Sequence, residues 1–235
     1  MTNEDATVGH EHADVTGGWL RPSVFGAMDG LVSNFALIAG VAGGGVSPRV
    51  VVLTGLAGLA AGAFSMAAGE YTSVASQAEN AEAEIAKERE ELERNPQGEE
   101  EELAAMYVDR GLDQELAREV SRQLHRDPER ALAQHTKEEL GITLEELPSP
   151  LLAAVSSFVS FAVGAMIPVL PYLLGAQVLW PAIVVSLLGL FGAGAVVTRL
   201  TSRPWWYGGL RQLILGAAAA ALTYGFGSLV GAGVG

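Results

Sequence analysis

Residues 50–94 read VVVLTGLAGLAAGAFSMAAGEYTSVASQAENAEAEIAKEREELER, and this segment is the most informative about the fold. Its first half, up to Tyr71, is apolar over about 20 residues, the length that a helix needs to cross a hydrocarbon core of roughly 30 Å. Its second half is rich in Glu, and after Gly69 there is neither Gly nor Pro before Pro96. We therefore expect one long helix that crosses a membrane and continues into water.

Four other apolar stretches have a similar length, and they predict further membrane spans. The five expected spans cover residues 24–46, 50–71, 151–174, 178–198 and 210–230. Pro168 and Pro171 should bend the third span, because each removes a hydrogen bond from the helical ladder. The predicted fold is an all-α membrane protein with five transmembrane helices.

The acidic residues divide the chain into domains. Of the 27 Asp and Glu, 21 lie between Ser76 and Pro148, and none follows Ser149. We expect a flexible cytosolic N-terminus at residues 1–20, transmembrane helices 1 and 2 at 21–75, an acidic helical cytosolic domain at 76–148, and transmembrane helices 3 to 5 at 149–235. The cytosolic domain is expected to bind metal.

Composition excludes several classes of protein. A formal net charge of −13 excludes a general nucleic-acid binder, which needs cations to neutralise phosphates. The absence of Cys excludes disulfides, thiolate zinc sites and cysteine nucleophiles. The excess of acid instead favours cations as partners.

Basic residues predict the orientation. With the N-terminus in the cytosol, 13 of the 14 Lys and Arg lie on the cytosolic side and only Arg49 lies outside. The positive-inside rule therefore predicts a cytosolic N-terminus and an external C-terminus. The chain has 12 Arg and 2 Lys, which favours a prokaryotic cell membrane over a vacuole.

Small residues on the spans predict close helix packing. Gly pairs four apart place two small residues on one helix face, where backbones can approach, within one chain or across an oligomer. Such pairs occur at Gly26 and Gly30, Gly40 and Gly44, Gly58 and Gly62, and Gly227 and Gly231.

The acidic segment has its own helix signals. Residues 95–98 (Asn-Pro-Gln-Gly) predict a turn, and Asp113 and Asp127 are expected to cap two helices that follow. A recurrence every four residues predicts a core-facing stripe made of Leu112, Leu116, Val120 and Leu124.

Like charges gather on the faces of these helices. Glu84, Glu88 and Glu91 share one face; Glu99 and Glu102 are three residues apart on the next helix, and His135 and Glu139 are four apart on the last. Such Glu pairs destabilise a bare helix by roughly 0.2–0.5 kcal/mol each. A divalent cation bound by carboxylates from several helices would compensate them. The alternative is a solvated acidic surface paired with Lys87, Arg89 and Arg94.

Asp29 and Glu70 are the only carboxylates in the predicted spans. A charge near the bilayer centre costs about 2.5–3.5 kcal/mol on insertion scales, so such residues usually face a bundle interior or a wet path. Met66 lies one turn before Glu70, and a thioether beside a carboxylate suits Fe²⁺ or Mn²⁺. Packing against lipid or the core is the alternative for Met66.

Three motifs resemble the vacuolar iron transporter family. They are residues 25–35 (FGAMDGLVSNF), 63–73 (AFSMAAGEYTS) and 138–142 (EELGI). The order of spans and acidic domain is similar as well, so the resemblance extends over nearly the whole chain from about Gly18.

The resemblance implies a homodimer that exports Fe²⁺, and also Mn²⁺, from the cytosol in exchange for protons, along a path at the dimer interface. It implies pathway roles for Asp29 as the proton-coupling carboxylate, Met66 as a thioether ligand and Glu70 as a carboxylate at the cytosolic mouth. It implies that ions gather in the cytosolic domain at Glu88, Glu91, Glu99, Glu102, His135 and Glu139. The metal is the substrate, and no permanent cofactor is expected. Eukaryotic members carry a Met-Met pair where this chain has His135 and Thr136.

Other functions fit the sequence less well. A membrane-anchored metal store or sensor is the main alternative, but the Glu-x-x-His pairs of ferritin-like proteins are missing before His125 and His135. A protein that merely anchors acidic helices for a partner would need only one span. An enzyme is not expected, because no pairing of nucleophile and base is visible.

Overall fold

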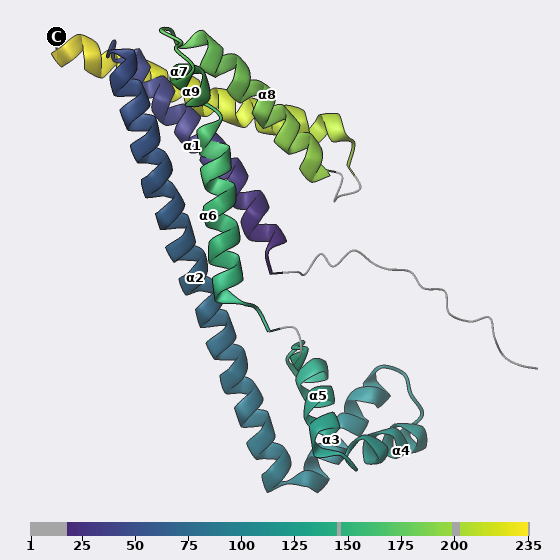
Figure 1. The fold of residues 1–235 in the computed structure, drawn as a ribbon. Coiled ribbons are helices and arrows are strands. Elements are labelled where there is room, and N and C mark those ends of the chain that lie inside the picture. The colour runs from purple at the N-terminus through teal and green to yellow at the C-terminus, as the bar shows by residue number, and fades with distance from the viewer. Residues whose placement is uncertain (1–17, 145–146, 199–202, 235) are drawn as a thin grey trace, which may run out of the picture. The chain divides into compact units, whose positions relative to one another are not determined.

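The structure is a computed structural model that describes residues 18–144, 147–198 and 203–234. Within these ranges the regular elements are helices and no strand occurs, which confirms the all-α prediction (Figure 1). The helices are α1 (Leu20–Gly43), α2 (Pro48–Arg94), α3 (Pro96–Asp109), α4 (Gln114–Leu124), α5 (Pro128–Glu139), α6 (Pro150–Met166), α7 (Leu170–Leu173), α8 (Trp180–Val197) and α9 (Trp205–Val234). The expected N-terminal tail at residues 1–20 lies outside the described residues except at its end.

The chain forms two compact units. One is Tyr71–Pro150, and the other joins the segments before and after it, up to Glu70 and from Leu151. Helix α2 belongs to both, as the absence of Gly and Pro after residue 69 predicts. We call them the acidic unit and the apolar unit.

In the apolar unit, α1, α2, α8 and α9 are long and apolar enough to cross a membrane. Many of their large apolar side chains are exposed, as lipid contact requires; examples are Leu53, Phe64, Leu222 and Leu229. Helix α6 is apolar but has only 17 residues.

The expected third span, at 151–174, is broken rather than bent. Helix α6 ends at Met166, and turns with bonds such as Val169 N to Met166 O lead to the four residues of α7. The physical reason is that Pro168 and Pro171 lack N–H groups, and two such losses within one turn end the ladder. A fifth span therefore remains a prediction.

All four glycine pairs pack against another helix of the same chain. A Cβ at Gly227 of α9 would collide with the backbone of Gly40 in α1, and a Cβ at Gly30 would meet the carbonyl of Phe161 in α6. Gly62 faces the ring of the same Phe161. The small residues therefore let α1 lie against α6 and α9 at backbone contact, and Figure 1 shows α1, α8 and α9 side by side.

The acidic unit consists of the second half of α2 with α3, α4 and α5. Both expected caps are present: Asp113 accepts from the N–H of Glu115 at 2.9 Å, and Asp127 accepts from the N–H of Glu129 at 3.1 Å. The expected turn at 95–98 is much shorter. Asn95 caps α3, and Pro96 is already its first residue.

The predicted stripe on α4 is wrong in one essential respect. Leu116 is 55% exposed, and the buried residues of α4 are Ala117 and Ser121. The hydroxyl of Ser121 donates to the carbonyl of Glu100 in α3 at 2.7 Å. Helix α4 thus packs through small residues at close range, which the periodicity of the large residues does not reveal.

Candidate metal centre

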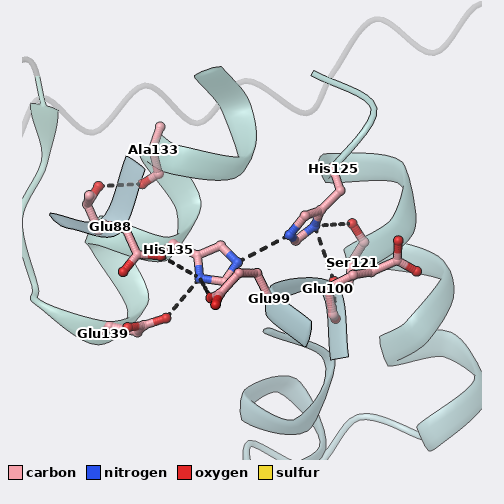
Figure 2. A network of polar contacts seen from close by, with 9 residues as sticks. Glu88, Glu99, Glu100, Ser121, His125, Ala133, His135 and Glu139 are labelled. Carbon is pink, nitrogen blue, oxygen red and sulfur yellow. Dashed lines mark hydrogen bonds and ion pairs between the residues drawn. The ribbon is translucent and has the colours of Figure 1, made fainter. Parts of the chain in front are cut away.

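Four predicted ligands meet in the acidic unit. They are Glu88 from α2, Glu99 from α3, and His135 and Glu139 from α5, and each contributes one ligand atom within 4.8 Å of all the others. Figure 2 shows His135 with one ring nitrogen directed at the three carboxylates. We call this group the metal centre.

The Nδ1 atom of His135 is the centre of the group. It lies 2.8 Å from Oε1 of Glu139, 3.1 Å from Oε1 of Glu88 and 3.9 Å from Oε2 of Glu99. A neutral imidazole nitrogen and three carboxylate oxygens form a mixed nitrogen and oxygen set. Such a set suits borderline ions such as Fe²⁺, Mn²⁺ and Zn²⁺.

Burial makes the metal centre unstable without a positive charge. The side chain of His135 is fully buried, and Glu88 is only 4% exposed. The Oε1 atom of Glu88 is buried and has no hydrogen-bond partner in the described structure, unless a proton on His135 supplies one. A buried carboxylate oxygen without a donor costs about 1–3 kcal/mol or more, so a bound cation or proton would stabilise the group.

The electrostatics point in the same direction. Burial, together with the charges of Glu139, Glu99 and Glu91, raises the pKa of Glu88 to about 7, while His135 acts against this shift. Burial, and next the charge of Glu102, also raises the pKa of Glu99. Proton binding near neutral pH at the place where a cation would bind makes the two competitors.

Nearby arginines do not neutralise the metal centre. Arg89 pairs with Glu129, joining α2 to α5, and Arg94 pairs with Glu90 one turn away on α2. Arg110 pairs with Glu138, next to the ligand Glu139. The pairs with Glu129 and Glu138 connect α5 to α2 and to the end of α3, and none of the three pairs includes a carboxylate of the metal centre. The alternative of a solvated acidic surface does not describe Glu88.

Two predicted ligands lie outside the four-membered group. Glu91 is half-buried and Glu102 is exposed; they act on the pKa values of Glu88 and Glu99 through their charge. Glu91 lies about one helical turn after Glu88, and Glu102 lies about one turn after Glu99. Their role as ligands remains a prediction.

In the apolar unit, Asp29 of α1 and Met66 of α2 line the same hollow of about 280 Å³. Ser33, Ser65 and Phe161 line it as well. A carboxylate, a thioether and hydroxyls thus meet between apolar helices. Glu70 is not among the lining residues, so its place on a path remains a prediction.

Sequence reasoning missed Asn34, which lines this hollow too. Its side-chain amide donates to the carbonyls of Gly55 in α2, at 3.1 Å, and of Ala165 in α6, at 2.6 Å. These two bonds use both amide hydrogens and leave the buried Oδ1 without a partner in the described structure. The signal available in the sequence was a polar side chain, Asn34, within a predicted membrane span.

Sequence reasoning also undervalued His125, which comes directly after α4. Its Nε2 atom lies 3.3 Å from Nε2 of His135. No motif predicts this contact, because ten residues and a turn separate the two.

Comparison with known proteins finds relatives that share the name vacuolar iron transporter and match nearly the whole chain. The chain is 42% identical over 228 residues to a vacuolar iron transporter of Acanthamoeba castellanii, covering 94% of this chain and 82% of that protein. It is 31% identical to vacuolar iron transporter 2 of rice, covering 94% and 92%, and 30% identical to vacuolar iron transporter 1 of Arabidopsis thaliana, covering 92% and 88%. The model of the VIT family matches residues 20–228. Since this match spans both compact units and both groups of candidate residues, the chain belongs to the VIT family.

Proposed function

We propose that this protein transports divalent transition metals, Fe²⁺ and also Mn²⁺, out of the cytosol in exchange for protons. The observation that carries the proposal is the metal centre, where a buried carboxylate without a donor faces an imidazole in a chain with long apolar helices. Relatives over nearly the full length carry the name vacuolar iron transporter. The metal is substrate, and the activity is transport rather than catalysis.

The two candidate sites would act in sequence. The metal centre gathers ions from the cytosol, because three carboxylates and one imidazole bind a divalent ion that water alone would keep hydrated. The hollow at Asp29 and Met66 then provides a second stop inside the apolar unit. Glu70 serves as a carboxylate on the way, and Glu91 and Glu102 raise the local cation concentration.

Asp29 is the proposed coupling group. A proton that reaches its carboxylate from the far side cancels the negative charge and weakens the hold on the metal. Loss of that proton toward the cytosol restores the binding charge. One carboxylate thereby links the movement of both ions in opposite directions.

The membrane arrangement is part of the proposal. We infer a homodimer with the path at its interface, in a prokaryotic cell membrane, with the N-terminus in the cytosol and the C-terminus outside. The dimer would appear by native mass spectrometry as twice the chain mass of 24.5 kDa. If the protein is a monomer in lipid nanodiscs, a path at a dimer interface is excluded.

The deciding experiment uses purified protein in liposomes that contain a pH-sensitive dye. Fe²⁺ under anaerobic conditions, and separately Mn²⁺, is added to the side that carries the acidic unit. We expect metal entry together with lumenal alkalinisation, and we expect Asp29→Asn to abolish both. Asp109→Asn, which removes a carboxylate from the acidic unit, is the matched control and should transport normally.

Other outcomes have clear meanings. Undiminished exchange in Asp29→Asn would exclude Asp29 from the mechanism. Tight metal binding without movement of metal or protons would replace the transporter by a membrane-anchored metal store or sensor.

A further inference from the structure

His125 makes contacts at both ring nitrogens. Its Nδ1 atom lies 2.9 Å from the backbone oxygen of Ser121, and its Nε2 atom lies 3.3 Å from Nε2 of His135 (Figure 2). The two rings meet edge to face at an angle of 86°. None of these contacts involves a carboxylate. His125 therefore contacts His135 at Nε2, whereas the carboxylates of the metal centre lie near Nδ1.

The carbonyl of Ser121 fixes the hydrogen on His125. A carbonyl oxygen can only accept, so Nδ1 of His125 must donate. In the neutral ring, Nε2 then has a lone pair and no hydrogen. Two bare nitrogens at 3.3 Å would repel each other, and His135 avoids this by donating from its own Nε2.

The hydrogen on Nε2 of His135 determines whether Nδ1 of the neutral ring carries a free lone pair. A neutral His135 with that hydrogen presents a lone pair at Nδ1, the atom 2.8 Å from Glu139 and 3.1 Å from Glu88. Acceptors this close to one another repel unless a cation or a proton lies between them, and that is the position a bound metal would take. That lone pair, together with the carboxylates, is a ligand set. The chain of contacts therefore runs from a backbone carbonyl through two imidazoles to the metal centre.

We propose that His125 is a positioning residue that holds His135 in the tautomer with its Nδ1 lone pair directed at the metal. The inference rests on the metal centre of the proposed function and adds a residue that no ligand motif contains. A histidine ligand in proteins usually donates its second N–H to a carboxylate, carbonyl or water, and loss of that partner costs 10- to 100-fold in metal affinity. Here a second histidine is the acceptor.

A rival arrangement would place one ion between the two Nε2 atoms. Among the described residues, the group of His, Asp and Glu ligand atoms that lie mutually close contains His135 but not His125, so no third side chain of these types joins the two histidines there. Two protein ligands are fewer than the four on the Nδ1 side. The geometry favours the Nδ1 side for this reason.

The first test measures Zn²⁺ affinity of the full chain in detergent by competition with a chelating dye. His125→Phe keeps a ring of similar shape and removes the acceptor, and we expect affinity to fall 10- to 100-fold. His125→Gln places an amide oxygen near the position of Nε2. Its affinity should lie within about threefold of the affinity of the unaltered chain, a much smaller change than the loss in His125→Phe. Ser121→Ala loses the bond to Glu100 and the 3.5 Å contact of its hydroxyl with Nδ1 of His125, and it keeps the backbone carbonyl that accepts from that nitrogen, so its affinity should fall less than that of His125→Phe.

The second test needs no variant. The chain has 4 His, so selective ¹⁵N labelling gives a small set of ring signals in long-range ¹H–¹⁵N spectra. On Zn²⁺ addition we expect the metal at Nδ1 of His135, with hydrogen retained at its Nε2 and at Nδ1 of His125. Zn²⁺ at either Nε2 atom would overturn the inference and establish the rival arrangement.

The tests separate the two proposals. If the unaltered chain fails to bind Zn²⁺, Mn²⁺ or Fe²⁺, the metal centre itself is wrong. If it binds but His125→Phe binds equally well, only the positioning role of His125 is wrong.

Discussion

Glu88 combines the properties that make a single residue informative: burial, a raised pKa of about 7 and an oxygen without a donor in the described structure. Since the pKa of the unfolded state is near the ordinary value of 4.5, the folded state holds the proton more tightly. The unfolded state therefore binds fewer protons between these two pH values. Stability contributed by this group falls as pH rises from about 4.5 to about 7 and is constant above.

We predict that Glu88→Gln removes this pH dependence. With a chelator present, the free energy of unfolding of the acidic unit should decrease less from pH 5 to pH 8 in the variant than in the unaltered chain. Hydrogen exchange measured on peptides from α3 to α5 reports that unit alone. Glu101→Gln removes an exposed carboxylate and should follow the unaltered chain.

Without metal, rising pH costs the unaltered chain more stability than it costs Glu88→Gln. With saturating metal, the unaltered chain should be the more stable of the two. Saturating Mn²⁺ at pH 8 stabilises the unaltered chain through binding to the folded state, while Glu88→Gln should bind at least about tenfold more weakly. Equal Mn²⁺ affinities would show that Glu88 is not a ligand, whatever its pKa.

At the scale of elements, the crossing of α1 and α9 depends on backbone contact. A Cβ at Gly227 would collide with the carbonyl of Gly40, which cannot move without shifting α1. Gly225 lies on the same helix, and a Cβ there meets nothing within 4 Å. The two glycines therefore offer a matched pair of substitutions.

We predict that Gly227→Ala destabilises the apolar unit by about 1–3 kcal/mol, the usual cost of overpacking. Gly225→Ala should leave stability unchanged or raise it, because Ala favours the helix. Thermal unfolding in detergent, followed by size-exclusion chromatography, measures both. An unchanged melting temperature in Gly227→Ala would mean that α1 and α9 do not cross at Gly40.

At the scale of the whole molecule, the distribution of charge orients the chain. The absence of Cys means that any introduced Cys is a unique reporter. Ser47, between α1 and α2, and Glu101, in α3, are both exposed. The predicted orientation places Ser47 outside and Glu101 in the cytosol.

We predict that a membrane-impermeant thiol reagent labels Ser47→Cys in intact cells. Glu101→Cys should react only after the cells are permeabilised. Mass shift on a gel measures both, and the unaltered chain is the blank. The opposite pattern would invert the proposed direction of transport.

The helical class, the long continuous helix α2 and the two caps at Asp113 and Asp127 could all be predicted from the amino-acid sequence. These features depend on local properties: apolar length, the absence of Gly and Pro, and side chains that bond their own backbone. Four of the six proposed cytosolic ligands lie close together in the structure, and their role as ligands stays a prediction. Helical spacing placed carboxylates on faces, and the family resemblance selected among them.

Other features became visible only in the folded chain. It broke the expected third span at Pro168 and Pro171, buried Ala117 in place of Leu116, and brought Asn34 to the hollow beside Asp29. It also placed His125 against His135. The last three share a physical reason: each depends on which surfaces of separate helices meet. Close packing between helices is set by small residues and shared polar contacts that leave no periodic trace in one chain segment. The break of the third span has a local cause, the missing N–H groups of Pro168 and Pro171, whose place the sequence predicts as a bend.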